Sequence, residues 1–287
     1  MKHFYIITNE QKDEELKVTK KMQAYIQKKG GSCGYALNRE AGKAGAGRLN
    51  PEVIPEDTEC VFCVGGDGTL IRAARDMVEK QIPLIGVNRG HVGYLCELDH
   101  STVFAAIDEL MQDHYMLENR MLLIGNCEIN GQIQEAHRAL NDIVIYRSGT
   151  PQMINLIIYV NGEYLNTYSA DGIIVATPTG STAYNMSAGG PIVDPKAELI
   201  LITPINPHAL NSKCIVLGAE DEIIVEVGSR RMEEDEEAEV SFDGDLSFRL
   251  QVGDKITIKR AKTRAHILKL SKRSFLEILR RKMQEHT

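Results

Sequence analysis

The chain has 287 residues, of which 43% are hydrophobic and 25% charged, and its formal net charge is −7. This composition is typical of a globular protein with room for two domains and a large buried core. The acidic balance argues against a nucleic-acid-binding protein, which normally presents a basic face. An anionic substrate would have to be attracted locally, by arginines, helix ends or a metal ion.

The cysteines and the lengths of the apolar runs indicate the cellular compartment of the protein. The six cysteines are scattered, which favours a reducing cytoplasm and no disulfide framework. The first residues run into a charged segment without a secretory layout, and no apolar run approaches membrane-spanning length. We therefore expect a cytoplasmic protein that does not cross a membrane.

The first part of the chain alternates between strand and helix patterns. Strands are predicted at 3–7, 32–37, 60–64 and 83–87, and helices at 10–29, 70–80 and 101–112. This order predicts a parallel sheet with helices around it. Ligands bind such sheets beyond the carboxyl ends of the strands, where the loops after Gly65 and Asn88 are expected.

The most informative stretch is Gly65-Gly66-Asp67-Gly68-Thr69, between an apolar strand and an amphipathic helix. The glycines allow positive φ and a close approach to a ligand, and Thr69 is placed to cap the helix, whose free N–H groups form an anion site. No lysine follows, so this is not the GxxxxGK[ST] phosphate loop. Asp67 needs either a cation beside it or a role in the chemistry. The alternative is a plain strand–turn–helix corner in which Asp67 is a turn residue.

From Tyr115 onward, alternating polar and apolar residues replace the helix patterns. We place the boundary near Asn119, with an α/β domain at 1–119 and a mostly β domain at 120–271. Asn130-Gly131 and Asn161-Gly162 predict hairpin turns. A basic helix, Lys272 to Glu285, is expected to pack back on the first domain. The predicted strands are 121–129, 133–147, 153–160, 163–168, 172–177, 199–203, 213–217, 222–227, 238–242, 246–250 and 255–260.

Several polar stretches interrupt these strands. Asn141-Asp142 is either a ligand-facing bulge or a turn, and Asp243-Gly244 is predicted to be a hairpin turn. Asp171 precedes an apolar run, and the run Thr177 to Pro191 combines hydroxyls, small residues and Tyr184, which suits ribose, phosphate and an aromatic ring. Without a ligand it would be a turn-rich connection.

Three other segments have simpler interpretations. The glycine-rich loop Asn38 to Asn50 is either a lid or an ordinary surface loop. The acidic run between Ser229 and Glu239 is expected to be a solvated hairpin tip. Cys60 and Cys63 are expected to be small buried residues, because residues three apart on a strand face opposite ways.

These motifs, taken in order, resemble the bacterial NAD kinases. The resemblance runs from about residue 60 to 245, and its most specific feature is the pairing of Gly-Gly-Asp-Gly-Thr with the run Thr177 to Tyr184. It is carried by residues 65–69, 86–93, 140–142, 170–172, 177–184, 189–191 and 204–208.

The resemblance implies a Rossmann-like three-layer α/β domain followed by a β-sandwich-like domain. It implies transfer of a phosphoryl group from ATP or polyphosphate to the 2′-hydroxyl of the adenosine ribose of NAD, giving NADP. Asp67 would be the general base, Gly68 would contact the dinucleotide by its backbone, and Arg72 would meet the substrate. Further substrate-binding residues would be Asn141 and Asp142 at the adenosine portion, Thr182, Ala183, Tyr184 and Ser187 at the adenine and nicotinamide pockets, and Asp171 at the nicotinamide end.

The same resemblance implies a cytoplasmic homodimer or homotetramer that uses a divalent cation such as Mg²⁺, whose ligands the motifs do not identify. Two other functions stay open. A lipid kinase shares the glycine turn, but it needs an apolar pocket, and residues 177–187 are polar and rich in hydroxyls. A non-catalytic dinucleotide sensor would not need the acid at Asp67.

Overall fold

The computed structural model describes residues 1–38, 49–89, 93–149, 152–209, 212–229, 237–271 and 273–285. The glycine-rich loop after Asn38 and the acidic run before Glu237 therefore lie largely outside the described residues. Two compact units are present, unit 1 (Met1–Arg120 and Arg264–Thr287) and unit 2 (Met121–Thr263). No helix among the described residues is long and apolar enough to span a membrane.

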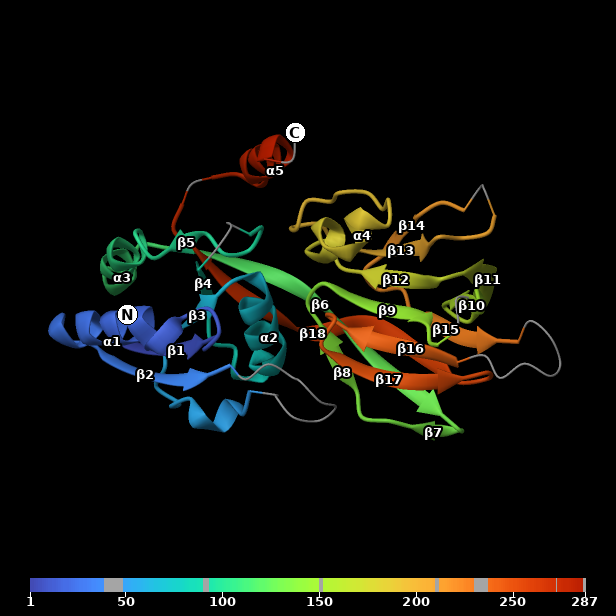
Figure 1. Ribbon diagram of the computed structural model, residues 1–287, viewed down its shortest axis with the longest axis horizontal. Coiled ribbons are helices and arrows are strands. Elements are labelled where there is room, and N and C mark those ends of the chain that lie inside the picture. Colours follow the sequence, from blue (N-terminus) through green and yellow to red (C-terminus); the bar gives the residue numbers. More distant parts are fainter. Residues whose placement is uncertain are drawn as a thin grey trace. The chain divides into compact units, whose positions relative to one another are not determined.

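Unit 1 is an α/β domain, as expected (Figure 1). Its parallel strands follow the order β2-β1-β3-β4, and a short fifth strand pairs with β4. The bounds are β1 (His3–Thr8), α1 (Lys17–Lys28), β2 (Ser32–Leu37), β3 (Cys60–Gly65), α2 (Asp67–Asp76), β4 (Leu84–Asn88), β5 (Leu98–Asp99), α3 (Val103–Met111) and α5 (Phe275–Glu285), with 3₁₀ segments at Glu14–Leu16, Pro51–Val53 and Val78–Lys80.

Helices α1 and α3 share one apolar cluster with the sheet. Met22 and Ile107 pack there with Phe4, Phe62 and other strand residues, all almost fully buried. Cys60 and Cys63 are likewise buried, and burial raises the pKa of both thiols, as expected of small core residues. The parallel register pairs Gly65 with Asn88, so the loops that follow β3 and β4 begin side by side, as the sequence predicts.

Helix α1 begins later than the predicted 10–29. Glu15 and Leu16 have φ of 54° and 57°, which a right-handed α-helix does not continue through. The buried carboxylate of Asp13 instead accepts hydrogen bonds from the N–H groups of Val18 and Thr19, which satisfies donors in the first turn.

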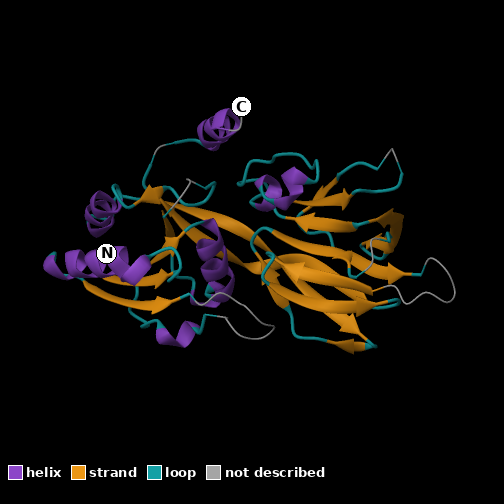
Figure 2. Ribbon diagram, viewed as in Figure 1, coloured by secondary structure: helices purple, strands orange, loops and turns teal. Residues whose placement is uncertain are grey.

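Unit 2 is a β-sandwich, and Figure 2 shows that strands dominate it. One six-stranded sheet has the order β14-β13-β12-β9-β16-β17, and the other contains β11-β10-β15-β18. The bounds are β6 (Met116–Ile129), β7 (Gln132–Ile133), β8 (His137–Ala139), β9 (Asp142–Arg147), β10 (Ile154–Val160), β11 (Glu163–Ala170), β12 (Gly172–Ala176), α4 (Tyr184–Ser187), β13 (Leu199–Ile205), β14 (Ile215–Gly218), β15 (Ile223–Gly228), β16 (Glu237–Phe242), β17 (Leu246–Gln251) and β18 (Lys255–Lys269), with a 3₁₀ segment at Gly180–Thr182.

A single apolar cluster draws side chains from both sheets of unit 2, among them Ile145, Ile173, Val225 and Phe242. The turns Asn130-Gly131 and Asn161-Gly162 have positive φ at both residues, as the predicted hairpins require. The strand predicted at 133–147 was wrong as one element, because it is divided into β7, β8 and β9.

Strands β6 and β18 belong partly to each unit. The second domain was expected to extend to residue 271, but the structure assigns residues 264–271 to unit 1, where Ile267 of β18 pairs with Leu84 of β4. Helix α5 also belongs to unit 1, although none of its described side chains is buried.

Gly86 in β4 has no side chain, and this leaves room for Cys96 to pack against the strand. A Cβ atom built at Gly86 would lie 2.3 Å from Cys96 Sγ. We expect Gly86→Ala to lower the free energy of unfolding by about 1–3 kcal/mol, because one of the two residues must move. Denaturant titration measures this loss.

Gly218→Ala is the matched control, since the nearest atom to its added Cβ is a side-chain oxygen at 3.3 Å. Cys96→Ala should restore part of the loss in a double variant. Equal stability of the Gly86 and Gly218 variants would contradict the account.

Candidate functional site

The glycine turn joins the buried strand β3 directly to α2. Gly65 and Gly66 have φ of 156° and 159°, which L side chains rarely adopt. A Cβ atom at Gly65 would also lie 2.4 Å from Thr69 Oγ1. The turn therefore needs glycine at Gly65 for both backbone and space.

The structure corrects the predicted role of Thr69. Helix α2 begins at Asp67, its N-cap is Gly66, and no side chain caps it. Thr69 lies in the first turn and is almost fully buried. The helix begins three residues earlier than expected because the carbonyl of Gly66 accepts hydrogen bonds from the N–H groups of Thr69 and Leu70.

Asp67 is held by a short backbone segment that follows β4. Its Oδ2 atom accepts hydrogen bonds from the N–H groups of Tyr94 and Leu95, at 2.7 and 3.2 Å, and Oδ1 accepts one from Cys96 at 2.9 Å. A carboxylate offers about four acceptor positions, so Oδ1 can accept a further hydrogen bond. The Asp67 carboxylate and burial raise the pKa of the Cys96 thiol, burial having the larger effect.

Gly93 provides the space for this contact. A Cβ atom at that residue would lie 2.1 Å from Asp67 Oδ2 and 2.2 Å from the carboxyl carbon. We call Gly93 and the N–H groups of residues 94–96 the Asp67 seat. Gly68 is exposed and Arg72 is half-buried on the same helix.

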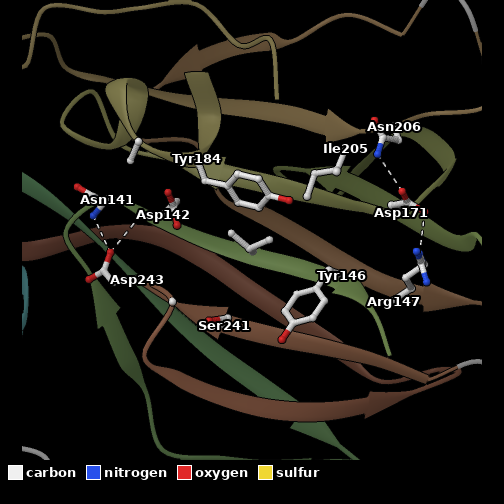
Figure 3. Close-up of a pocket in the computed structure, with 13 residues that line it drawn as sticks. Asn141, Asp142, Tyr146, Arg147, Asp171, Tyr184, Ile205, Asn206, Ser241 and Asp243 are labelled. Carbon is white, nitrogen blue, oxygen red and sulfur yellow. Dashed lines mark hydrogen bonds and ion pairs between the residues drawn. The ribbon is translucent and has the colours of Figure 1, made fainter. Parts of the chain in front are cut away.

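A cavity of about 660 Å³ opens within unit 2 (Figure 3). It is lined by Asn141, Asp142, Val144, Tyr146, Arg147, Asp171, Ala183, Tyr184, Ile205, Asn206, Ser241, Asp243 and Gly244. Figure 3 shows the rings of Tyr184 and Tyr146 directed into it from different elements. Its size and its mixture of rings, aliphatic groups and polar atoms suit an organic ligand.

Asp243 organises one end of this cavity. Its carboxylate accepts hydrogen bonds from the N–H groups of Leu140, Asn141 and Asp142, at 2.9, 2.7 and 3.2 Å. These bonds explain the break between β8 and β9, because three successive amides leave the ladder for one carboxylate. Asp243 and Gly244 have φ of 54° and 70°, so they also form the predicted hairpin turn.

Asp142 is 5% exposed beside this acid. Burial, and to a smaller extent the Asp243 charge, raises the pKa of Asp142 to about 7. A carboxyl group with this pKa exists in both protonation states near neutral pH, so it can donate or accept a hydrogen bond in the cavity.

Asp171 lies at another part of the lining. It accepts hydrogen bonds from Asn206 Nδ2 at 2.9 Å and Arg147 Nε at 2.8 Å. The Asn206 hydrogen bond, followed by the Arg147 contact, lowers the pKa of the Asp171 carboxyl group. Asp171 therefore stays ionised at neutral pH.

The structure brings together Asn141, Asp142, Asp171, Ala183 and Tyr184 of the predicted substrate-binding residues. Thr182 and Ser187 do not line this cavity among the described residues. The sequence did not identify Tyr146, Arg147, Asn206 or Ser241 as lining residues. Asp243 and Gly244 also line the cavity, and the sequence predicted them only as a hairpin turn.

No group of three His, Cys, Asp or Glu side chains within the described ranges could hold a metal ion. A divalent cation such as Mg²⁺ commonly uses only one or two carboxylates and takes its other ligands from phosphates and water.

Protonation of Asp142 predicts a pH-dependent stability. The folded-state pKa of about 7 lies above the unfolded value near 3.9, so the folded chain keeps a proton that the unfolded chain loses between these values. Stability from this group is present below about pH 4 and falls by at most about 1.4 kcal/mol per pH unit toward pH 7. We expect Asp142→Asn to gain melting temperature over the wild type more at pH 8 than at pH 5.

Thermal unfolding of both proteins at the two pH values measures this gain. Asp245→Asn serves as a control for loss of one carboxylate near the same turn. An equal gain of Asp142→Asn at both pH values would show that Asp142 is already ionised at pH 5.

The Asp67 seat predicts a cost for Gly93→Ala. The added methyl group must displace the carboxylate, and we expect the free energy of unfolding to fall by about 1–3 kcal/mol. The same substitution in an Asp67→Ala chain should cost much less, because no carboxylate remains to collide. Equal costs in the two backgrounds, measured by denaturant titration, would refute the contact.

Comparison with family models shows two matches that cover most of the chain. Residues 4–115 match the ATP-NAD kinase N-terminal domain, and residues 140–270 match the ATP-NAD kinase C-terminal domain. Proteins named NAD kinase are similar over the full length. One from Agathobacter rectalis is 54% identical over 100% of both chains, and one from Lachnospira eligens is 43% identical over 99% of this chain and 100% of its own.

Two solved structures resemble the fold. Yeast NADH kinase complexed with NADH gives a TM-score of 0.77 at 23% identity, over 98% of this chain and 86% of its own. An NAD kinase from Archaeoglobus fulgidus in complex with ATP gives 0.72 at 25% identity, over 94% of each chain. The strand–glycine turn–helix of unit 1, the polar cavity of unit 2 and these full-length matches place the chain in the NAD kinase family.

Proposed function

We propose that this chain phosphorylates NAD at the 2′-hydroxyl of its adenosine ribose, with ATP or polyphosphate as donor, and so makes NADP. Membership of the NAD kinase family supports the reaction class. The observation that carries the acceptor is the 660 Å³ cavity, where polar side chains surround two tyrosine rings.

In this proposal the unit 2 cavity binds the dinucleotide. Asn141 and Asp142 would contact the adenosine portion, and Asp171 would hold the nicotinamide end. Ala183 and Tyr184, which line the cavity, would form the adenine and nicotinamide pockets, and Thr182 and Ser187, which flank them in the chain outside its lining, would have to complete these pockets when the ligand binds. Support comes from the amide and carboxyl groups of the lining, which suit a base edge and a ribose, and from rings that suit stacking.

Unit 1 would supply the catalytic acid. We propose that Asp67 is the general base, that Gly68 contacts the substrate through its backbone, and that Arg72 meets it from the first turn of α2. Phosphoryl transfer asks a protein mainly for positioning and charge stabilisation. The three amides that hold Asp67 fix its orientation and leave Oδ1 able to accept the hydroxyl proton.

The proposed cofactor is a divalent cation, Mg²⁺, which would neutralise charge on the donor phosphates. No three-ligand protein site exists in the described part of the chain, so the phosphates would supply most of its ligands. We also propose a cytoplasmic homodimer or homotetramer. The described cysteines are all free thiols, which suits a reducing compartment.

The assay is NADP formation from NAD, ATP and Mg²⁺ by purified protein, with diacylglycerol as a competing acceptor. We expect NADP and no phosphorylated lipid. Phosphorylation of lipid alone would establish a lipid kinase, and tight NAD binding without turnover would establish a sensor.

Asp67→Asn tests the catalytic role. Because general-base help is worth roughly 10²–10⁴-fold, we expect kcat to fall by about that factor while the Kd for NAD stays within about twofold. Asparagine keeps the size and an acceptor oxygen, and Asp99→Asn provides a control at another acid of the same unit. A near-normal kcat for Asp67→Asn would exclude Asp67 as the base.

A further inference from the structure

A second cavity, of about 280 Å³, lies within unit 1 between Gly93 and helix α5. Its lining includes four basic side chains and one acidic one, which are Arg273, Arg280, Arg281, Lys282 and Glu277. Arg273 and Arg280 are exposed. The cavity is therefore cationic, although the whole chain carries a net charge of −7.

Most of these charged residues lie on α5, and helix periodicity brings several of them to one side of it. Residues 277, 280, 281 and 284 recur at spacings of three and four, which places them along one side of α5, and Arg273 lies just before the helix. Glu277, the acidic residue among them, forms hydrogen bonds at the start of the helix. Ser274 N–H donates to Glu277 Oε2 and Glu277 N–H donates to Ser274 Oγ, so the two residues form a capping box at the start of the helix.

The chain just after β18, ahead of α5, is hydrogen-bonded to Glu97, which follows the segment that holds Asp67. The Glu97 carboxylate accepts hydrogen bonds from the N–H groups of Leu270 and Ser271 and from the Ser271 hydroxyl. Glu97 directly follows Cys96, whose N–H group binds Asp67. Gly93 belongs both to the Asp67 seat and to the lining of the cationic cavity. Gly93 therefore connects the Asp67 seat to the lining of the cationic cavity within one unit.

We propose that this cavity binds the phosphoanhydride chain of the phosphoryl donor. Such a chain carries several negative charges and needs cations close to the reacting phosphate. At about 280 Å³ the cavity lies just below the usual size of small-molecule sites, so it can hold phosphoryl groups but not a complete nucleotide. Donors that share the phosphate chain, ATP, GTP and inorganic polyphosphate, would then bind through the same cations.

This inference rests on the proposed function and is tested with Arg280→Gln/Arg281→Gln in the full-length chain. Inorganic triphosphate is the probe, and calorimetry measures its Kd without NAD. We expect binding about tenfold weaker or more in the double variant. Lys20→Gln/Lys21→Gln removes two exposed charges from α1 and should bind as the wild type does. No binding to the wild type, or equal binding by both double variants, would overturn the proposal.

Steady-state kinetics give the second measurement. The KM for ATP, GTP or polyphosphate, whichever donors the wild type uses, should rise about tenfold in Arg280→Gln/Arg281→Gln, while the KM for NAD stays unchanged. Arg280→Lys/Arg281→Lys keeps the charge and should recover most of the donor affinity. A rise in the KM for NAD alone would assign the cations to the dinucleotide and overturn the proposal.

The two hypotheses fail in different ways. Wild-type protein that binds triphosphate but forms no NADP would refute the proposed function and keep the anion site. Protein that forms NADP with an unaltered donor KM in the double variant would refute the anion site and keep the function.

Discussion

The hydrogen bonds between the Asp67 carboxylate and the amides of residues 94–96 are the constraint on which the candidate chemistry of unit 1 depends. They require Gly65 and Gly66 to turn the chain sharply, and Gly93 to leave room for the carboxylate. An ionised acceptor makes stronger hydrogen bonds than a neutral one, so this contact can fix a backbone segment that has little regular structure. Glu97, which follows this segment, acts in the same way, because its carboxylate accepts hydrogen bonds from the N–H groups of residues 270 and 271.

Unit 2 uses the same physical device. Asp243 accepts hydrogen bonds from three successive amides at one carboxylate and thereby positions Asn141 and Asp142 at the cavity. The consequence is that Asp142 becomes buried next to a second acid, and its pKa rises to about 7. In both units a structural carboxylate shapes the loop at the candidate site, so the acids of this chain contribute more than surface charge.

The sequence was sufficient to predict the elements that have strong local signals. The apolar strand before Gly65 and the helix after it identified the glycine turn, and the Asn-Gly pairs identified two hairpins. Asn141, Asp142, Asp171 and Tyr184 could be selected because polar groups between apolar strands are unusual. Their convergence on one cavity could not be selected from the sequence, since it depends on which strands become neighbours.

The errors have the same origin. Thr69 was expected to cap α2 because its hydroxyl suits a cap, but the carbonyl of Gly66 already begins the helix. Tyr146 and Arg147 lie at the end of a predicted strand, where alternation does not show which of them faces a ligand. The role of Asp243 needed the strands around it in place, because its partners lie about one hundred residues earlier in the chain. The need for glycine at Gly93 likewise depends on the position of the Asp67 carboxylate, which the sequence does not show.

The turnover number of Gly93→Ala, measured with NAD, ATP and Mg²⁺ beside the Kd for NAD, tests the central claim most directly. The substituted glycine has no functional group, and a Cβ atom there would lie 2.1 Å from Asp67 Oδ2; an unchanged KM for ATP separates displacement of Asp67 from an effect on the cavity that Gly93 also lines. The account predicts that kcat falls by about the same factor as in Asp67→Asn, roughly 10²-fold or more, while NAD binding is retained. A Gly93→Ala protein with near-normal kcat would contradict it, because the reaction would then proceed without the Asp67 seat.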